Sequence, residues 1–250
     1  MSVIFAIARR ELNSYFQTAV GWLSLLGFVG LSGLTFAWIV SAYGDPMNAL
    51  SGQAIDINQY LIPDFFGTLA VFLLLLSPAL SMRLFSEDFQ QNSFELLLSS
   101  PITSQQIVLG KFFGALGFVG TLLLSTTHCM AILYWLSTPD IIIMMMNYLS
   151  TFLMTASFVS LCMLFSAFTR SQLIALALGF TSILALWFLS GIAEMASGNV
   201  KEILSFASVL SHTESLNKGL LQLKDIVYFI SFIAFFLFAT QQRIEAYRWQ

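Results

Sequence analysis

Few residues in this chain have the chemistry of a catalytic or metal-binding site. His128 precedes Cys129 inside a long apolar stretch, and His212 and Glu214 lie in the sequence SHTES. A histidine within an apolar helix can line a pathway, but it is more often neutral and hydrogen-bonded inside its own bundle. His212 and Glu214 could contact a substrate or a metal at the outer face, and the alternative is a solvated turn. Two histidines are too few for a typical multi-histidine metal site, and none is predicted.

The motifs of common enzyme classes are missing. The sequence has no G-x-x-x-x-G-K-[ST] phosphate-binding loop and no H-E-x-x-H zinc motif. The stretch GFTS at 179–182 lacks the features of a serine nucleophile elbow. No acid or base occupies the middle of a predicted span, which disfavours a proton-coupled carrier. We therefore expect no enzymatic activity and no cofactor in this chain, with an intramembrane enzyme around His128 and Cys129 as an alternative.

The segment SEDFQQNSFELLLSSP, residues 86–101, interrupts the apolar sequence with three acids and no base. On an ideal helix its apolar residues form two stripes on nearly opposite sides. The first stripe comprises Phe85, Phe89 and Leu96, and the second comprises Phe94 and Leu98. Pro101 ends this helix. A single stripe would let the helix lie on a membrane, whereas two stripes favour packing on its own bundle and in the groove of a partner.

The composition identifies the solvent that surrounds most of the chain. Only 9% of the residues are charged, 58% are hydrophobic, and the mean hydropathy is +0.83. Soluble domains carry about a quarter charged residues, so lipid must surround this one. Six windows free of charge are long enough, or nearly so, to cross a bilayer: 12–44, 65–82, 112–139, 141–169, 171–193 and 226–242. The sequence predicts an all-α integral membrane protein with six transmembrane helices in one domain, residues 1–250.

The distribution of basic residues predicts the orientation of these spans. With the N-terminus inside, the inner segments hold Arg9, Arg10, Arg83, Lys111, Arg170, Arg243 and Arg248. The outer segments hold Lys201, Lys218 and Lys224, all in one loop. The positive-inside rule then places both termini in the cytoplasm. The net charge of −3 gives no reason to expect a nucleic-acid partner.

Two segments outside the spans are also expected to be helical. Residues 1–18 have apolar side chains at helical spacing, which indicates an amphipathic helix in the headgroup plane or an extension of the first span. The outer loop at 194–224 alternates charged and apolar residues and is expected to form short helices. Gly110 and Gly114, four residues apart, would allow close helix contact without specifying the partner helix.

At this point the sequence resembles a known family. The stretch FSEDFQQNSFELLLSSPITSQQIVLGKFFGA is similar to the second cytoplasmic loop of ABC-2-type permeases, with Glu87, Glu95 and Pro101 at the acidic and proline positions. RRELNSYF near the N-terminus resembles the start of that family. The C-terminal part resembles its gliding-motility-associated (GldF-like) branch, through Asp225, Tyr228, Phe229, Ser231, Glu245, Arg248 and Trp249.

The resemblance implies a permease of an ABC exporter in the bacterial cytoplasmic membrane. Such a permease pairs with a second copy or a related permease, and two separate cytoplasmic ATPase subunits supply ATP and Mg²⁺ sites. The loop at 84–101 would be the coupling helix that docks in an ATPase cleft. Its expected coupling residues are Phe85, Glu87, Phe89, Phe94, Glu95, Leu96, Leu97, Leu98 and Pro101.

The resemblance leaves an alternative and gives one electrostatic expectation. The chain could instead be a non-transporting anchor of an ATPase-driven envelope machine, with an additional envelope subunit as a partner. Membrane lipids are expected partners in either case. Because no base occurs between residues 84 and 110, the ATPase cleft is expected to be neutral or basic.

Overall fold

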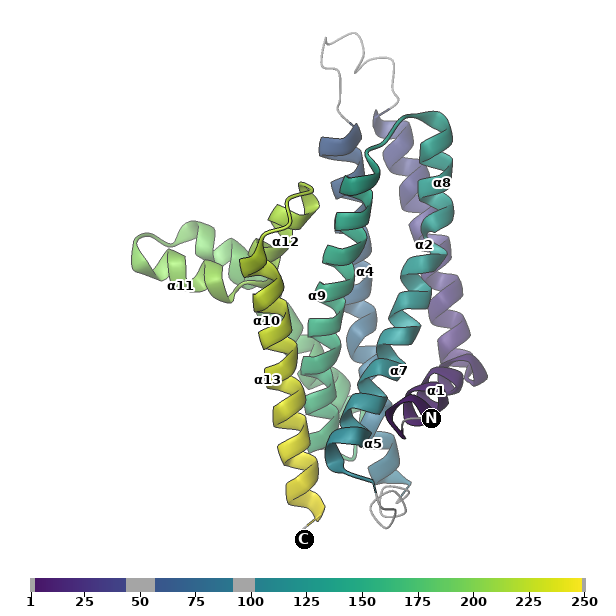
Figure 1. Cartoon of the computed structure of the whole chain (residues 1–250), viewed down its shortest axis with the longest axis vertical. Helices are drawn as coiled ribbons and strands as arrows, with labels where there is room; N and C mark the ends of the chain where they lie inside the picture. The colour runs from purple at the N-terminus through teal and green to yellow at the C-terminus, as the bar shows by residue number, and fades with distance from the viewer. Residues whose placement is uncertain (1–2, 44–56, 92–101, 249–250) are drawn as a thin grey trace.

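The protein is an elongated bundle of helices, seen in the computed structural model in Figure 1. The structure describes residues 3–43, 57–91 and 102–248, and these contain no strand. The helices are α1 (Val3–Gln17), α2 (Ala19–Tyr43), the π-helical turn η1 (Ile57–Leu61), α4 (Ile62–Ser81), α5 (Arg83–Gln90), α7 (Ser104–Ser125), α8 (Thr127–Leu136), α9 (Ile141–Phe168), α10 (Gln172–Met195), α11 (Asn199–Ala207), α12 (Val209–Asn217) and α13 (Leu223–Arg248).

Six helical segments in the described part of the chain are long and apolar enough to cross a membrane. They are Ala19–Tyr43, Ile57–Gln90, Ser104–Leu136, Ile141–Phe168, Gln172–Met195 and Leu223–Tyr247. The predicted all-helical fold with six spans is therefore confirmed. Helix α7 starts at Ser104, so it includes Lys111 as well as the first part of the charge-free window 112–139.

The central element of the bundle is α9. In its most apolar window 72% of the residues are buried, against 22% for α2 and 17% for both α10 and α13. Figure 1 shows α4, α7 and α13 around α9, with α2 on the far side of α7. The outer helices α2, α10 and α13 therefore present most of their surface to whatever surrounds the bundle.

Small hydroxyl residues allow α9 to occupy this position. Thr155, Ser157 and Ser160 are fully buried, and each hydroxyl donates to a carbonyl one turn earlier on α9, at 2.7, 3.0 and 2.8 Å. A buried hydroxyl that returns its proton to its own helix leaves no unmet donor in the bundle. The short side chains let neighbouring backbones approach closely, as in many membrane bundles.

The N-terminal helix α1 is separate from the first span and lies across α7 at the lower end of the bundle (Figure 1). Gly110 and Gly114 of α7 form the floor of this contact. A Cβ at Gly110 would lie 2.6 Å from Ile7 Cβ, and a Cβ at Gly114 would lie 2.5 Å from Glu11 Cβ. Real Cβ atoms do not approach so closely. The pair of glycines thus specifies the helix that packs on it, which the sequence left open.

At the other end, the segment between α10 and α13 holds the two short helices α11 and α12. Figure 1 shows α11 projecting sideways from the bundle, while α12 lies beside the upper part of α9. The hydroxyl of Ser208 caps α12 by accepting from the Ser211 N–H at 3.4 Å. The turn after α12 has Gly219 at φ +78°, a backbone conformation that favours glycine.

The glycine contact gives a direct test of this packing. Gly110→Ala should destabilise the protein by about 1–3 kcal/mol, because the added methyl overlaps Ile7 and must push α1 away from α7. Gly120→Ala is the matched control in the same helix, since its Cβ would meet no atom within 4 Å. Thermal unfolding of both variants in detergent should show a loss for Gly110→Ala alone. Equal midpoints would contradict the close contact.

Candidate functional site

The segment expected to meet a partner begins as a continuation of the second span. Between α4 and α5 the chain turns at Met82, where Ser166 of α9 intervenes. The Ser166 hydroxyl donates to the Met82 carbonyl at 2.7 Å and accepts from the N–H groups of Phe85 and Ser86 at 3.0 and 3.1 Å. These are backbone groups that a helix end leaves without internal partners. One buried hydroxyl thus fixes the start of α5 to the centre of the bundle.

The described coupling candidates lie on two sides of α5. Phe85 and Phe89 are 0% and 5% exposed, and the Phe89 ring lies 5.0 Å from that of Tyr247 in α13. Both rings therefore pack on the bundle itself. Glu87 lies on the partly exposed side of α5. The remaining candidates lie outside the described residues: Phe94, Glu95, Leu96, Leu97, Leu98 and Pro101. Contact of this segment with an ATPase stays a prediction.

A cluster of ion pairs joins α5 to α1 and α7. The Lys111 ammonium lies 2.9 Å from a Glu11 carboxylate oxygen and 2.8 Å from a carboxylate oxygen of Asp88. Its side chain is 2% exposed, and those of Glu11 and Asp88 are 12% and 18% exposed. A buried charge is tolerated only when it is paired, and here one ammonium meets two carboxylates from two other helices. We call these three residues the Lys111 cluster.

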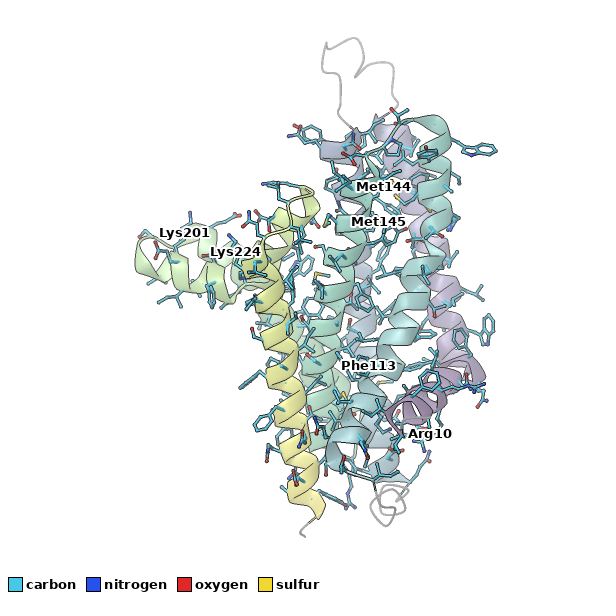
Figure 2. The ribbon with its side chains drawn as sticks, in the orientation of Figure 1. Arg10, Phe113, Met144, Met145, Lys201 and Lys224 are labelled. Carbon is cyan, nitrogen blue, oxygen red and sulfur yellow. The ribbon has the colours of Figure 1, made fainter. Side chains whose placement is uncertain are left out.

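Within the Lys111 cluster, the electrostatics favour the charged form of Glu11. Burial alone would raise the pKa of Glu11, but the nearby Lys111 ammonium outweighs this effect and holds the pKa of Glu11 below its usual range. Arg10 adds a second cation, 3.2 Å from the same carboxylate, at the exposed outer edge of α1 (Figure 2). The two acids are therefore balanced by one buried and one exposed base.

A second contact fastens α1 to the span that leads into α5. The hydroxyl of Tyr15 donates to the Leu80 carbonyl at 2.9 Å, and its ring stacks on Phe118 of α7 at 4.7 Å. The Arg83 guanidinium lies 4.6 Å from the Tyr15 ring and donates to the Thr18 hydroxyl at 3.3 Å. Burial raises the pKa of Tyr15, so the phenol keeps the proton that it donates. Thus α1, α4 and α7 meet at one point next to the Lys111 cluster.

The ion pairs of Lys111 were not predicted from the sequence. The sequence placed Lys111 among the bases of the inner segments and counted Asp88 as one of three acids in the segment 86–101, without pairing them. The available signal was that Lys111 has no other charged residue near it in sequence between positions 96 and 139. Such an isolated lysine beside an apolar run requires an acid from another element.

At the opposite end, His212 is buried, so its interpretation as part of a solvated turn was wrong. It is 7% exposed, and its Nδ1 lies 2.7 Å from a carboxylate oxygen of Asp225, itself 1% exposed. Its Nε2 lies 3.1 Å from the Phe206 carbonyl, and its ring stacks 4.0 Å from that of Tyr228. The Ser215 hydroxyl donates to the other oxygen of Asp225. These contacts tie α11, α12 and α13 together.

The other two candidates lie elsewhere. Glu214 is exposed on α12 and lines a pocket, whereas His128 is exposed on α8. His128 Nδ1 lies 2.5 Å from the Ser125 carbonyl, and its Nε2 lies 3.3 Å from Cys129 Sγ. The structure therefore brings His212 and Glu214 onto one helix and keeps His128 apart from both. Across residues 3–43, 57–91 and 102–248, no three His, Cys, Asp or Glu side chains form a group that could hold a metal ion.

Comparison with known proteins identifies the family. The family model described as ABC-2 family transporter protein matches residues 6–244. The chain belongs to the ABC-2 transporter family. It is thus a multi-pass membrane protein and a permease component of an ABC transporter, not itself catalytic. A search of curated proteins finds no match.

In this permease the match covers both ends that the geometry singles out. It includes Glu11, Asp88 and Lys111 at one end, and His212 and Asp225 at the other. Permeases of this family generally pair with ABC ATPase subunits. The Lys111 cluster is the charged contact between α5 and the rest of the bundle, so it is the candidate site for transmitting motion.

The Lys111 cluster predicts a large asymmetry between single and combined substitutions. Lys111→Met should destabilise the permease by roughly 3–5 kcal/mol, because two partly buried carboxylates then lose their buried cation and only the exposed Arg10 remains beside Glu11. The triple variant Glu11→Gln, Asp88→Asn, Lys111→Met removes all three charges and should recover most of that loss. Thermal unfolding in detergent measures both. A triple variant no more stable than Lys111→Met would show that the charges are not the cause.

Proposed function

We propose that this permease couples ATP hydrolysis by separate cytoplasmic ABC ATPase subunits to export of a substrate across the bacterial cytoplasmic membrane. ATP and Mg²⁺ bind in those subunits. The segment 84–101 docks on the ATPase as a coupling helix. The observation that supports this most is the Lys111 cluster, because it ties α5 to α1 and α7 at the point where α5 leaves the bundle.

The geometry of α5 suits the transmission of force. Three kinds of contact hold it: the Ser166 hydroxyl on its first N–H groups, the Phe89 ring against Tyr247, and the Asp88 ion pair with Lys111. These partners belong to α9, α13 and α7. A displacement of the segment 84–101 therefore acts on three spans at once, because none of these contacts can break without leaving a buried group unpaired or a cavity.

The orientation follows from where the bases gather. Arg83 at the start of α5 donates to Thr18, Lys111 of α7 pairs with Glu11 of α1, and Arg170 donates to Tyr247 near the end of α13. Figure 1 shows α1, α5 and the C-terminal end of α13 at the same end of the bundle. Lys201 of α11 and Lys224 at the start of α13 lie away from that end (Figure 2), and Lys218 follows α12. The positive-inside rule supports a cytoplasmic position for α5 and for both termini. That position puts the coupling segment where ATP is found.

A second permease completes the transporter in this proposal. It is either another copy of this chain or a related permease. The support is the exposure of α2, α10 and α13, whose apolar windows are only 22%, 17% and 17% buried. The apolar surfaces of α2, α10 and α13 are suited in composition to contact either lipid or a neighbouring permease. A substrate path between two permeases would require an exposed helix surface of this kind.

The experiment that tests the proposal begins with a pull-down of the tagged permease in mild detergent. It should recover an ABC ATPase, and the purified complex in liposomes should hydrolyse ATP faster with the transported substrate present. An ATPase that co-purifies but responds to no candidate substrate would favour a non-transporting anchor in an envelope machine of the gliding-motility-associated type. Recovery without any ATPase would overturn the proposal.

The expected electrostatics of the coupling segment give a further prediction. Glu87→Lys combined with Glu95→Lys should weaken assembly with the ATPase by about 1–2 kcal/mol, roughly fivefold to thirtyfold in affinity. The reason is that a neutral or basic cleft repels the added cations. Affinity is measured by titrating the ATPase onto the permease in nanodiscs.

The control makes one Glu→Lys change far from the coupling segment. Glu202→Lys on the exposed face of α11 should leave the affinity for the ATPase unchanged. If the double variant assembles and couples ATP hydrolysis as well as the control does, the cleft is not basic and the electrostatic part of the proposal is wrong.

A further inference from the structure

A pocket in the described part of the permease lies at the end away from α5. Its volume is about 630 Å³, and it is lined by η1, the start of α4, one turn of α9 and one face of α12. Ligand pockets in proteins span roughly 300–1,000 Å³. None of the coupling contacts described above involves the residues that line this cavity. We call it the α12 pocket.

The walls of the α12 pocket are held in place by hydrogen bonds to α9. On one side, Asn58 of η1 accepts from the Asp140 N–H at 2.7 Å, at the residue that caps α9. On the other side, the fully buried Asn147 of α9 donates to the Asn217 carbonyl of α12 at 3.1 Å. The lining residue Ile143 lies between, and it also packs against Gly219. The pocket is therefore preformed, which lowers the cost of binding.

The side chains at the α12 pocket carry one charge of each sign. Glu214 and Lys218 are both exposed and lie four residues apart on and just after α12. Side chains at this spacing are neighbours on one helix face, about 5–6 Å apart at their Cβ atoms. Among the described residues, neither side chain forms an ion pair. Both charges are thus available to a ligand.

The remaining lining groups suit an organic cation next to an anion. Tyr60 contributes a phenol ring that is 50% exposed, and aromatic faces bind ammonium groups. The side-chain amides of Gln59 and Asn217 add N–H donors, which suit phosphate oxygens. Pro63 supplies an apolar surface at the start of α4. A ligand complementary to this set has an ammonium and a phosphate a few ångströms apart.

The position of the pocket along the spans favours a lipid. It lies where α4 and α9 begin, at Ile62 and Ile141, so it sits at the boundary between apolar and polar sequence. Headgroups occupy this level of a bilayer. The apolar side chains of Pro63 and Ile143 in the pocket lining offer surface for the first part of the acyl chains.

We propose that the α12 pocket binds the headgroup of a zwitterionic aminophospholipid. Lys218 and the neighbouring amides hold the phosphate, while Glu214 and the Tyr60 ring hold the ammonium. A soluble compound with the same groups, such as glycerophosphoethanolamine, shares this chemistry. An anionic lipid without an ammonium offers Lys218 a phosphate but leaves Glu214 facing a second negative charge, so the pocket discriminates between the two lipid classes.

The test compares two lipids on the full-length permease by native mass spectrometry from detergent. Phosphatidylethanolamine and phosphatidylglycerol with identical acyl chains are added in equal amounts. The wild type should retain roughly twofold to fivefold more phosphatidylethanolamine, the size expected of one exposed ion pair. Glu214→Gln should bring this ratio to about one, and Lys218→Gln should reduce retention of both lipids. Each variant should unfold at the wild-type temperature, since both positions are exposed.

Controls and a soluble arm separate the outcomes. Lys201→Gln with Glu202→Gln removes one charge of each sign from α11, outside the pocket, and should leave the ratio unchanged. If millimolar glycerophosphoethanolamine displaces the lipid, the headgroup alone is the ligand, and if it does not, the pocket recognises the lipid with its chains. A wild-type ratio of one, or a ratio unchanged by Glu214→Gln, overturns the proposal. No ATPase is present, so the result is independent of the coupling mechanism.

Discussion

The buried ammonium of Lys111 is the constraint on which the cytoplasmic-side architecture proposed here depends. It is 2% exposed in a helix that otherwise meets the requirements of a membrane span. A charge in that position is tolerated only with carboxylates beside it, and the chain supplies them from α1 and α5. Helix α1 must therefore cross α7 at Gly110 and Gly114, and α5 must stay close to the bundle. One residue thus ties two helices, α1 and α5, to α7.

The two ends of the bundle are held together by different sets of polar contacts. At the α5 end, charges and backbone groups are paired between helices that are far apart in sequence, such as Glu11 and Lys111. At the α12 end, His212 meets Asp225, and amides join η1 and α12 to α9. Between the two ends, α9 packs through small residues whose hydroxyls donate hydrogen bonds to carbonyls of α9 itself. A rigid central helix between two fastened ends is suited to carry a displacement along its length.

The spans were predictable from the sequence because lipid imposes a strong rule on them. Charged residues are costly in hydrocarbon, so charge-free windows mark the helices, and all six appear in the structure. The contacts were not predictable by the same rule. Nothing in the sequence says that Lys111 pairs with an acid 100 residues earlier, because that depends on how α1 packs. The stripe pattern of 86–101 did indicate that Phe85 and Phe89 share a face, and both are buried together.

The same limit explains the error at His212. A histidine among serine, threonine and glutamate reads as a surface turn when only local sequence is considered. Its partner, Asp225, begins the last span, and the two meet because α12 folds back against the start of α13. Burying Asp225 at the edge of an apolar helix requires two donors, and His212 and Ser215 supply them. That arrangement fastens α12 to α13, and the hydrogen bond from Asn147 fastens it to α9, so Glu214 and Lys218 are exposed on a helix held from two sides.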